Sequence, residues 1–170
     1  MSSVEVAITG LGSYLPGRTV TNDDLAQRLD SSDEWIRTRT GIRERHYAAP
    51  EEATSDLALT AAGRALVDAG LEPTDVDVLI VATTTPDHPI PATAPIVAAR
   101  LGVECAAFDL NAACSGFVYG LTVGSALAVA FAPVLLLGPI VRAHVSTPVT
   151  LRSLLCPLLL SSHTPSPLPP

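Results

Sequence analysis

The sequence predicts a layered α/β domain in which helices flank a mostly parallel central sheet. The chain has 170 residues, which is enough for one domain with a substantial core. Its residues are 48% hydrophobic and only 16% charged, a composition that argues against disorder. Strand-like segments alternate with helix-like segments along the chain, and this order favours parallel strands joined by helical crossovers.

The first part of the chain predicts one strand and two capped helices. The run VEVAITGLG, residues 4–12, is a short β-rich segment closed by glycines. In TNDDLAQRL, Thr21 is a candidate N-cap and Asp24 follows three positions later, as in a capping box. In SSDEWIRTRTG, serines precede acidic residues, arginines follow, and Gly41 ends the segment, which predicts a second helix.

The middle of the chain predicts two helices and two buried strands. TSDLALTAAGRALVDAGL places small and apolar residues on one helical face and stops at Gly70. DVDVLIVATTT is nearly continuous in apolar residues, as expected for a central strand covered on both faces. A proline-rich loop, PDHPIPATAP, leads to the short helix IVAARLG. CAAFDLNAA predicts a further buried strand, which runs directly into Cys114 and the apolar helix behind it.

This agreement between local signals ends after about Leu127. Neither a helical nor a strand period holds across the remaining residues, where prolines cut apolar runs. We therefore divide the chain into a layered half, residues 1–127, and an atypical Pro/Leu-rich tail, residues 128–170. Within the tail we expect a strand near Val134–Leu137 and disorder from about Ser161 onward.

Charge and cysteine content narrow the possible functions. The net charge of −7 leaves no broad basic surface, so nucleic acid is not an expected partner. Cys105, Cys114 and Cys156 have no metal-binding spacing and form no even disulfide framework, so we expect no metal site. The N-terminal residues lack the features of a secretory signal, and a reducing, cytoplasmic location is the expectation.

One apolar run raises the alternative of a membrane anchor. LTVGSALAVAFAPVLLLGPIV is long enough to span a bilayer. Pro133, Pro139 and the lack of flanking basic anchors favour instead a buried helix followed by a buried strand, and no membrane contact.

Cys114 is a candidate nucleophile. It precedes a predicted helix, where N–H groups and the helix dipole favour a thiolate and can hold an oxyanion. Its neighbours in NAACSGFVYG are small, so an acyl group can approach the sulfur. The alternative is an inert structural cysteine, which is how we interpret Cys105 and Cys156. A cysteine hydrolase is the weakest alternative, since no histidine stands in a motif-like context.

Three runs of the sequence resemble β-ketoacyl-acyl carrier protein synthase III, a condensing enzyme of the thiolase superfamily. They are GLGSYLPGRTVTNDDL, SSDEWIRTRTGIRERHYAAPEE and NAACSGFVYGL, in order between about Val4 and Leu127. The resemblance implies the N-terminal half only of a thiolase-like fold. It implies an acyltransferase that loads an acyl group from acyl-CoA onto Cys114 and condenses it with malonyl-acyl carrier protein, releasing CO₂ and initiating fatty acid biosynthesis.

The resemblance also implies substrate-binding residues. Trp35 matches the position whose ring stacks on the CoA adenine, Arg39 a residue near the CoA nucleotide, and Ser31 a hydroxyl residue beside the adenine. Ile90 matches a loop position that reaches the acyl pocket of the neighbouring subunit in a homodimer. No cofactor is implied, since acyl-CoA is a substrate. The alternatives are core packing for Trp35, a solvated charged face for Arg39 and ordinary interface packing for Ile90.

The family's catalytic His and Asn, supplied by its second half, have no counterpart in the tail. We therefore expect a truncated or frame-shifted synthase that lacks full activity. Two alternatives stay open: a priming ketosynthase of a polyketide pathway, and a catalytically silent fragment that binds CoA.

Overall fold

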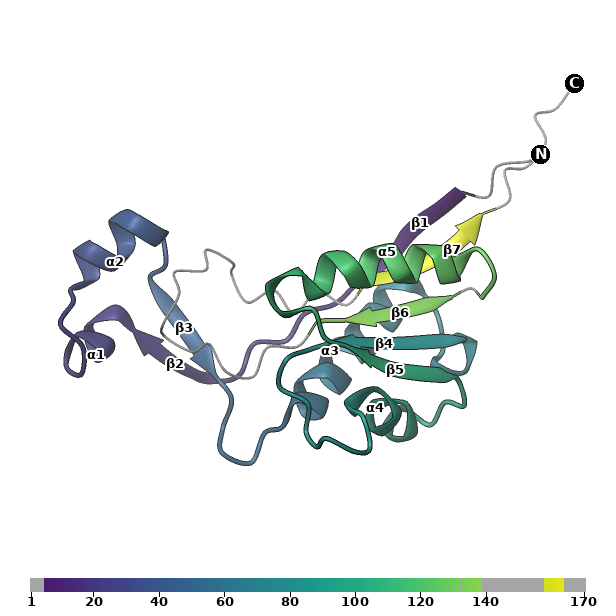
Figure 1. Ribbon diagram of the computed structural model, residues 1–170, viewed down its shortest axis with the longest axis horizontal. Coiled ribbons are helices and arrows are strands. Elements are labelled where there is room, and N and C mark those ends of the chain that lie inside the picture. The colour runs from purple at the N-terminus through teal and green to yellow at the C-terminus, as the bar shows by residue number, and fades with distance from the viewer. Residues whose placement is uncertain (1–4, 132, 139–157, 164–170) are drawn as a thin grey trace, which may run out of the picture.

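The computed structural model describes residues 5–131, 133–138 and 158–163 (Figure 1). Its main sheet has the strand order β1-β7-β6-β4-β5. The bounds are β1 Glu5–Leu11, β4 Val78–Ala82, β5 Ala106–Leu110, β6 Val134–Leu137 and β7 Leu158–His163. β4 pairs in parallel with β5 and β6, whereas β7 pairs antiparallel with β6 and β1. Only β7 therefore runs against the other strands of this sheet, and the predicted mostly parallel α/β fold is confirmed.

Helices cover both faces of this sheet (Figure 1). α3 (Thr54–Ala69) and α4 (Thr93–Leu101) pack on one face, and α5 (Gly116–Ala128) packs on the other. β4 is buried along its whole length: Leu79 and Val81 join the core under α3 and α4, and Ile80 joins the core under α5. Each such side chain contributes roughly 1.5–3 kcal/mol when fully buried, so the apolar run of β4 fixes the three-layer arrangement.

Two glycines let helices approach the strands closely. A Cβ at Gly12, directly after β1, would collide with the backbone carbonyl oxygen of Ala61 on α3. On α5, a Cβ at Gly120 would lie 2.6 Å from a methyl carbon of Leu136 on β6. At Gly12 the backbone of α3 leaves no room for a side chain, whereas a Cβ at Gly120 would force the Leu136 side chain to shift.

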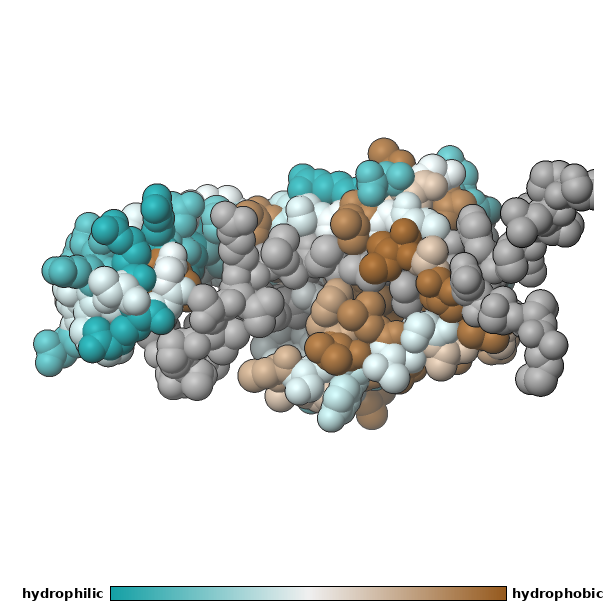
Figure 2. Space-filling view, turned by 90° about the horizontal axis from the view of Figure 1, so that it is seen from above, coloured by the Kyte–Doolittle hydropathy of each residue, from teal (hydrophilic) through white to brown (hydrophobic). Residues whose placement is uncertain are grey.

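A small lobe, residues 18–47, lies beside the sheet at the left of Figure 1. Its strands β2 (Arg18–Thr21) and β3 (Glu44–Tyr47) pair antiparallel, and its helices are α1 (Asn22–Ala26) and α2 (Asp33–Thr40). Figure 2 shows hydrophilic residues over this lobe and apolar residues gathered over the sheet-bearing part. The buried apolar side chains of the lobe are Leu25 and Ile36.

Both helices of the small lobe have the predicted caps. Thr21 and Asp24 form a capping box, in which the Thr21 hydroxyl accepts a hydrogen bond from the Asp24 N–H at 3.1 Å. The Ser32 hydroxyl accepts from the Trp35 N–H at 3.1 Å, and Gly41 ends α2 in the left-handed region at φ 71°. These signals act within one helical turn, which is why the sequence predicts them correctly.

The sequence does not predict β2, β3 or β7. β2 and β3 are short and mostly polar, so no apolar alternation marks them. β7 comes from the tail and completes the sheet between β1 and β6. The expected disorder is therefore wrong for 161–163, because Ser161, Ser162 and His163 pair with β1. The rest of the expected disordered segment, 164–170, lies outside the described residues.

The strand predicted at Val134–Leu137 is confirmed as β6, and all four of its residues are buried. The long uncharged run thus divides into a helix, α5, and a strand, β6. Among the helices of the described ranges, none is long and apolar enough to cross a membrane.

Candidate functional site

Cys114 lies where the main sheet passes into α5. β5 ends at Leu110, a short 3₁₀ turn η2 covers Ala113–Ser115, and α5 begins at Gly116. Cys114 is exposed, and Ala113 before it has φ 46°. A non-glycine residue in the left-handed region is uncommon and marks a tight turn. The turn presents the thiol at the end of the strand instead of burying it in the sheet.

Backbone hydrogen bonds hold this turn in place. The Ser115 N–H donates to the Ala112 carbonyl oxygen at 3.0 Å, and the Ala113 N–H donates to the Asn111 side-chain oxygen at 3.4 Å. Thr83 directly follows the neighbouring strand β4, and its N–H donates to the Leu110 carbonyl oxygen at 3.1 Å. The segment that carries Cys114 is therefore fixed to the end of β4 as well as to itself.

The electrostatics of this position come from the backbone. α5 has 13 residues, none of them charged, and its dipole places partial positive charge at the end nearest Cys114. Ser115, the residue before α5, makes no side-chain capping hydrogen bond within the described part of the chain. Negative charge that develops on a thiolate or an oxyanion here is therefore favoured by the helix start.

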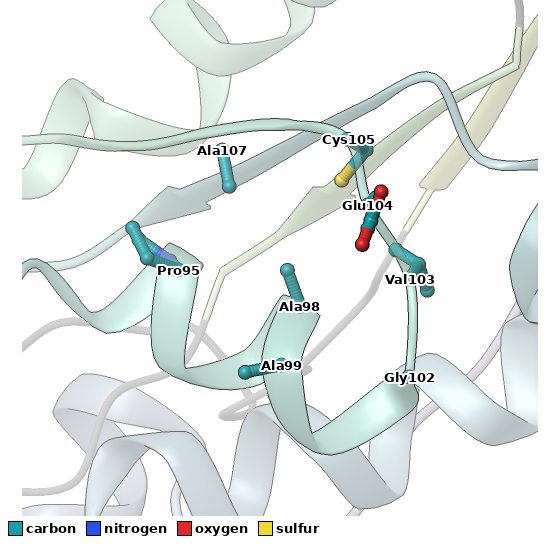
Figure 3. Close-up of a pocket in the computed structure, with 8 residues that line it drawn as sticks. All are labelled: Pro95, Ala98, Ala99, Gly102, Val103, Glu104, Cys105 and Ala107. Carbon is teal, nitrogen blue, oxygen red and sulfur yellow. The ribbon is translucent and has the colours of Figure 1, made fainter.

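Cys105 stands at the opposite end of β5, in a different environment. Burial raises the pKa of the Cys105 thiol, and the negative charge of Asp77 raises it further. The thiol faces an open groove of about 540 Å³ between α4 and β5 (Figure 3). The lining residues are Pro95, Ala98, Ala99, Gly102, Val103, Glu104, Cys105 and Ala107. A thiol held in its neutral form is a poor nucleophile, which agrees with a structural role for Cys105.

The structure brings Trp35 and Arg39 together on α2. The guanidinium carbon of Arg39 lies 4.5 Å from the centroid of the Trp35 ring, within the range of a cation–π contact. The Trp35 side chain is 51% exposed, so it is not a core residue. Of the two interpretations considered for this ring, core packing is wrong, because α2 turns it toward solvent.

Ser31 stands two residues before α2. Its backbone N–H donates to the Leu29 carbonyl oxygen at 2.8 Å. Its hydroxyl oxygen is shielded from solvent and has no hydrogen-bond partner among the described residues. A hydroxyl can both donate and accept a hydrogen bond, so this group keeps unused bonding capacity just before α2.

Ile90 lies in the loop that follows β4 and is 88% exposed. Polar contacts to neighbouring helices hold this loop: the Ser55 N–H donates to the Asp87 carboxylate at 3.0 Å, and the Asp87 N–H donates to the Thr93 hydroxyl at 3.1 Å. β4 and β5 are parallel neighbours, so this loop and the Cys114 turn both leave the sheet where the carboxyl ends of the strands lie. Figure 1 shows that these carboxyl ends are turned toward the small lobe.

Asp109 is a residue that the sequence analysis misses. Its two carboxylate oxygens accept the N–H groups of Thr93 at 2.8 Å and Ala94 at 2.7 Å. It thereby caps α4 from β5, in place of Ala92, which makes no capping hydrogen bond in the described structure. A single acid inside an apolar strand is the signal that points to such a role. The contact links the strand that precedes the Cys114 turn to the helix that follows the Ile90 loop.

Comparisons with known proteins indicate what the chain as a whole is similar to. No family model matches the chain. A β-ketoacyl-[acyl-carrier-protein] synthase III of Streptomyces coelicolor is 60% identical over 121 residues, which is 71% of this chain and 36% of that protein. The chain is homologous to the N-terminal part of β-ketoacyl-acyl carrier protein synthase III. It therefore spans much less than the full length of the synthases III that it matches.

Solved structures extend the likeness to the fold. The synthase III of Aquifex aeolicus superposes with a TM-score of 0.83 at 36% identity, covering 92% of this chain and 54% of that one. A priming β-ketosynthase of the R1128 polyketide pathway superposes with a TM-score of 0.75 at 31% identity, covering 96% of this chain and 51% of that one. The predicted fold, the N-terminal half of a thiolase-like condensing enzyme, is thus confirmed. The boundary between residues 127 and 128 stays a prediction.

Proposed function

We propose that Cys114 accepts an acyl group from acyl-CoA, as in the first half-reaction of a synthase III. The observation that carries this proposal is the exposed thiol of Cys114 on a turn with left-handed Ala113, directly before an uncapped helix. The likeness to synthases III supports the choice of acyl-CoA as the donor. Burial raises the pKa of the Cys105 thiol, which disfavours Cys105 as the acceptor.

The proposed step is a thioester exchange. The Cys114 sulfur attacks the thioester carbonyl carbon, and the oxyanion of the tetrahedral intermediate is stabilised by the N-terminal end of α5. The bond between that carbon and the CoA sulfur then breaks. CoA leaves as a thiolate that takes up the proton lost by the cysteine, so the step needs no metal or cofactor. Because the attacking and leaving groups are both thiols, the free-energy change of the exchange is close to zero.

The small lobe would hold the nucleotide end of CoA. Half of the Trp35 side chain is open to solvent and offers a flat surface for the adenine, while the Arg39 guanidinium beside it suits a phosphate. Ser31 would lie beside the base, and its shielded hydroxyl, which has no hydrogen-bond partner among the described residues, would bond to the base once the atoms covering it move. We further propose that Ile90 reaches the acyl pocket of a second subunit in a homodimer, consistent with its exposure.

The complete reaction would continue with malonyl-acyl carrier protein in the cytoplasm, where loss of CO₂ supplies the carbanion that attacks the acyl group on Cys114. This condensation would initiate fatty acid biosynthesis. The likeness to a priming β-ketosynthase of a polyketide pathway supports a second candidate, in which the same acyl-enzyme primes a polyketide chain. The residues named above bear on the acyl-transfer step, which both candidates share.

Radiolabelled acetyl-CoA tests the acyl-transfer step directly. Wild type, Cys114→Ala and Cys105→Ala are incubated with the label, denatured and counted. We expect wild type and Cys105→Ala to retain the label and Cys114→Ala to lose it. Equal labelling of Cys114→Ala and wild type would remove Cys114 as the acceptor. Saturable CoA binding without label in wild type would instead support the silent CoA-binding fragment.

A further inference from the structure

Asn22 is a buried amide in the small lobe, and all of its side-chain polar groups are used. It is the first residue of α1, and only 1% of it is exposed. Its Nδ2 donates to Asp33 Oδ1 and to the Ile42 carbonyl oxygen, both at 2.8 Å. Its Oδ1 accepts from Arg45 Nη1 at 2.7 Å. One side chain therefore makes three short hydrogen bonds to residues far from it in sequence.

These three partners lie around α2. Asp33 is the first residue of that helix, Ile42 directly follows the Gly41 that ends it, and Arg45 lies on β3. The Asn22 amide is thus bonded at both ends of α2 and to the adjacent strand. A helix whose two ends are bonded to one buried group is fixed in rotation as well as in position.

Apolar packing holds α2 only weakly. The helix has eight residues, of which only Ile36 and Thr40 are buried. A helix this short is not stable by itself, and one apolar side chain does not define its rotation about its own axis. The hydroxyl of Thr40 donates to the Ile36 carbonyl oxygen and accepts from the Ile42 N–H at 3.1 Å. Both bonds are local to α2 and the turn that follows it, and therefore do not attach α2 to the rest of the lobe. The interhelical bonds of Asn22 supply that attachment.

We infer that Asn22 is a positioning residue that orients α2, so that Trp35 and Arg39 face a CoA nucleotide together. The ligand in this inference, CoA, rests on the proposed function. The claim that Asn22 orients α2 does not depend on that function. Without the amide, the Asp33 carboxylate and the Ile42 carbonyl lose a shared donor, and α2 samples several orientations. The fraction of molecules ready to bind then falls, and the apparent affinity falls in proportion.

The single tryptophan of the chain makes the orientation of α2 measurable without any ligand. Fluorescence anisotropy and acrylamide quenching of Trp35 are recorded for wild type, Asn22→Ala and Thr40→Val, followed by calorimetric titration with CoA. Thr40→Val is the matched control, because it removes two hydrogen bonds that are local to α2 and its C-terminal turn but leaves the three Asn22 hydrogen bonds in place. The rate of Cys114 alkylation reports whether the sheet-bearing part is intact.

We expect Asn22→Ala to lower the Trp35 anisotropy and to raise the Kd for CoA about tenfold, as when about a tenth of the molecules stay binding-competent. Thr40→Val should stay within about twofold of wild type, and Cys114 alkylation should be unchanged in both. If Asn22→Ala does not fold, Asn22→Asp replaces it, since it keeps the size and the Arg45 contact but removes both donated hydrogen bonds.

Each outcome bears on one of the two claims. A folded Asn22 variant with wild-type anisotropy and wild-type CoA affinity would overturn the positioning role. Equal losses in Asn22→Ala and Thr40→Val would also overturn it, because they indicate general destabilisation. If wild type itself does not bind CoA, the proposed function fails, while the anisotropy measurement still decides whether Asn22 orients α2.

Discussion

The guanidinium carbon of Arg39 lies 4.5 Å from the ring centroid of Trp35, one helical turn earlier on α2. Residues four positions apart share one face of a helix, so the pair follows directly from the helical register. The ring keeps half of its surface open to solvent beside the cation. An exposed aromatic ring and a guanidinium group thus lie side by side in the structure, an arrangement that would lower the ordering cost of binding the proposed nucleotide.

The first prediction concerns this pair. Trp35→Ala should raise the Kd for CoA by about tenfold or more, because stacking of a base on an aromatic ring contributes roughly 1–3 kcal/mol. Arg39→Ala should weaken binding as well, and more strongly at low salt than at high salt. Calorimetric titration measures both effects. Arg18→Ala is the control, since Arg18 makes a similar contact with Tyr47 in the same lobe, at 5.9 Å. Equal losses in Arg18→Ala would argue against a local adenine site.

The second prediction concerns thiol reactivity. At neutral pH, iodoacetamide should modify the exposed Cys114 faster than Cys105, since burial and the charge of Asp77 raise the pKa of the Cys105 thiol and so lower its thiolate fraction. The modification of Cys105 should therefore speed up as the pH is raised. Peptide mass spectrometry at several pH values measures both rates. Comparable rates at neutral pH would contradict the assigned environments.

The third prediction concerns the contact between β1 and α3. Gly12→Ala should destabilise the protein by about 1–3 kcal/mol, because its Cβ has no room against the backbone of α3. Gly17→Ala is the matched control, since no atom lies within 4 Å of the Cβ position there. Urea unfolding followed by circular dichroism compares the midpoints. Similar midpoints for the two variants would show that α3 is not packed as described.

The fourth prediction concerns acid stability. The Asp56 carboxylate accepts the Ala53 N–H at 2.7 Å and pairs with Arg100 at 2.8 Å, and the backbone hydrogen bond is the main cause that holds its pKa below 3.8. A lowered folded-state pKa gives stability that is present above pH 3.8 and is lost as pH falls through the folded-state value.

Asp56→Asn should therefore be less stable than wild type at neutral pH, and the difference in unfolding free energy should shrink below about pH 4. Urea unfolding at a series of pH values measures that difference. Asp23→Asn, at another exposed acid in the first turn of a helix, controls for the general loss of a negative charge. A difference that grows toward low pH would contradict the assigned direction of the Asp56 pKa.

The features that could be predicted without a structure are local ones, such as helix caps and helix ends. The caps at Thr21 and Ser32 and the helix end at Gly41 involve atoms within one turn, so residue type alone indicates them. The prediction of α4 begins too late: IVAARLG starts at Ile96, whereas the helix starts at Thr93. The cap that permits the earlier start is Asp109, which comes from another strand.

The candidate site was predictable in its members but not in its arrangement. Cys114 could be located because a strand, a tight turn and a helix follow one another in the sequence. The roles expected of Trp35 and Arg39 depended on the resemblance, since residue type alone does not show whether a tryptophan ring is exposed or buried. Asn22 was not found at all, because its partners lie 11, 20 and 23 positions away.

The sequence by itself determined the order of the helices and of strands β1, β4, β5 and β6, and the position of the cysteine, because each depends on periodicity or on hydrogen bonds within a few residues. Only the tertiary structure decided that β7 lies between β1 and β6, that Asp109 caps α4 and that one amide holds both ends of α2. These contacts form between distant segments, and a backbone or carboxylate group finds such a partner only when the packed core has brought the two segments together.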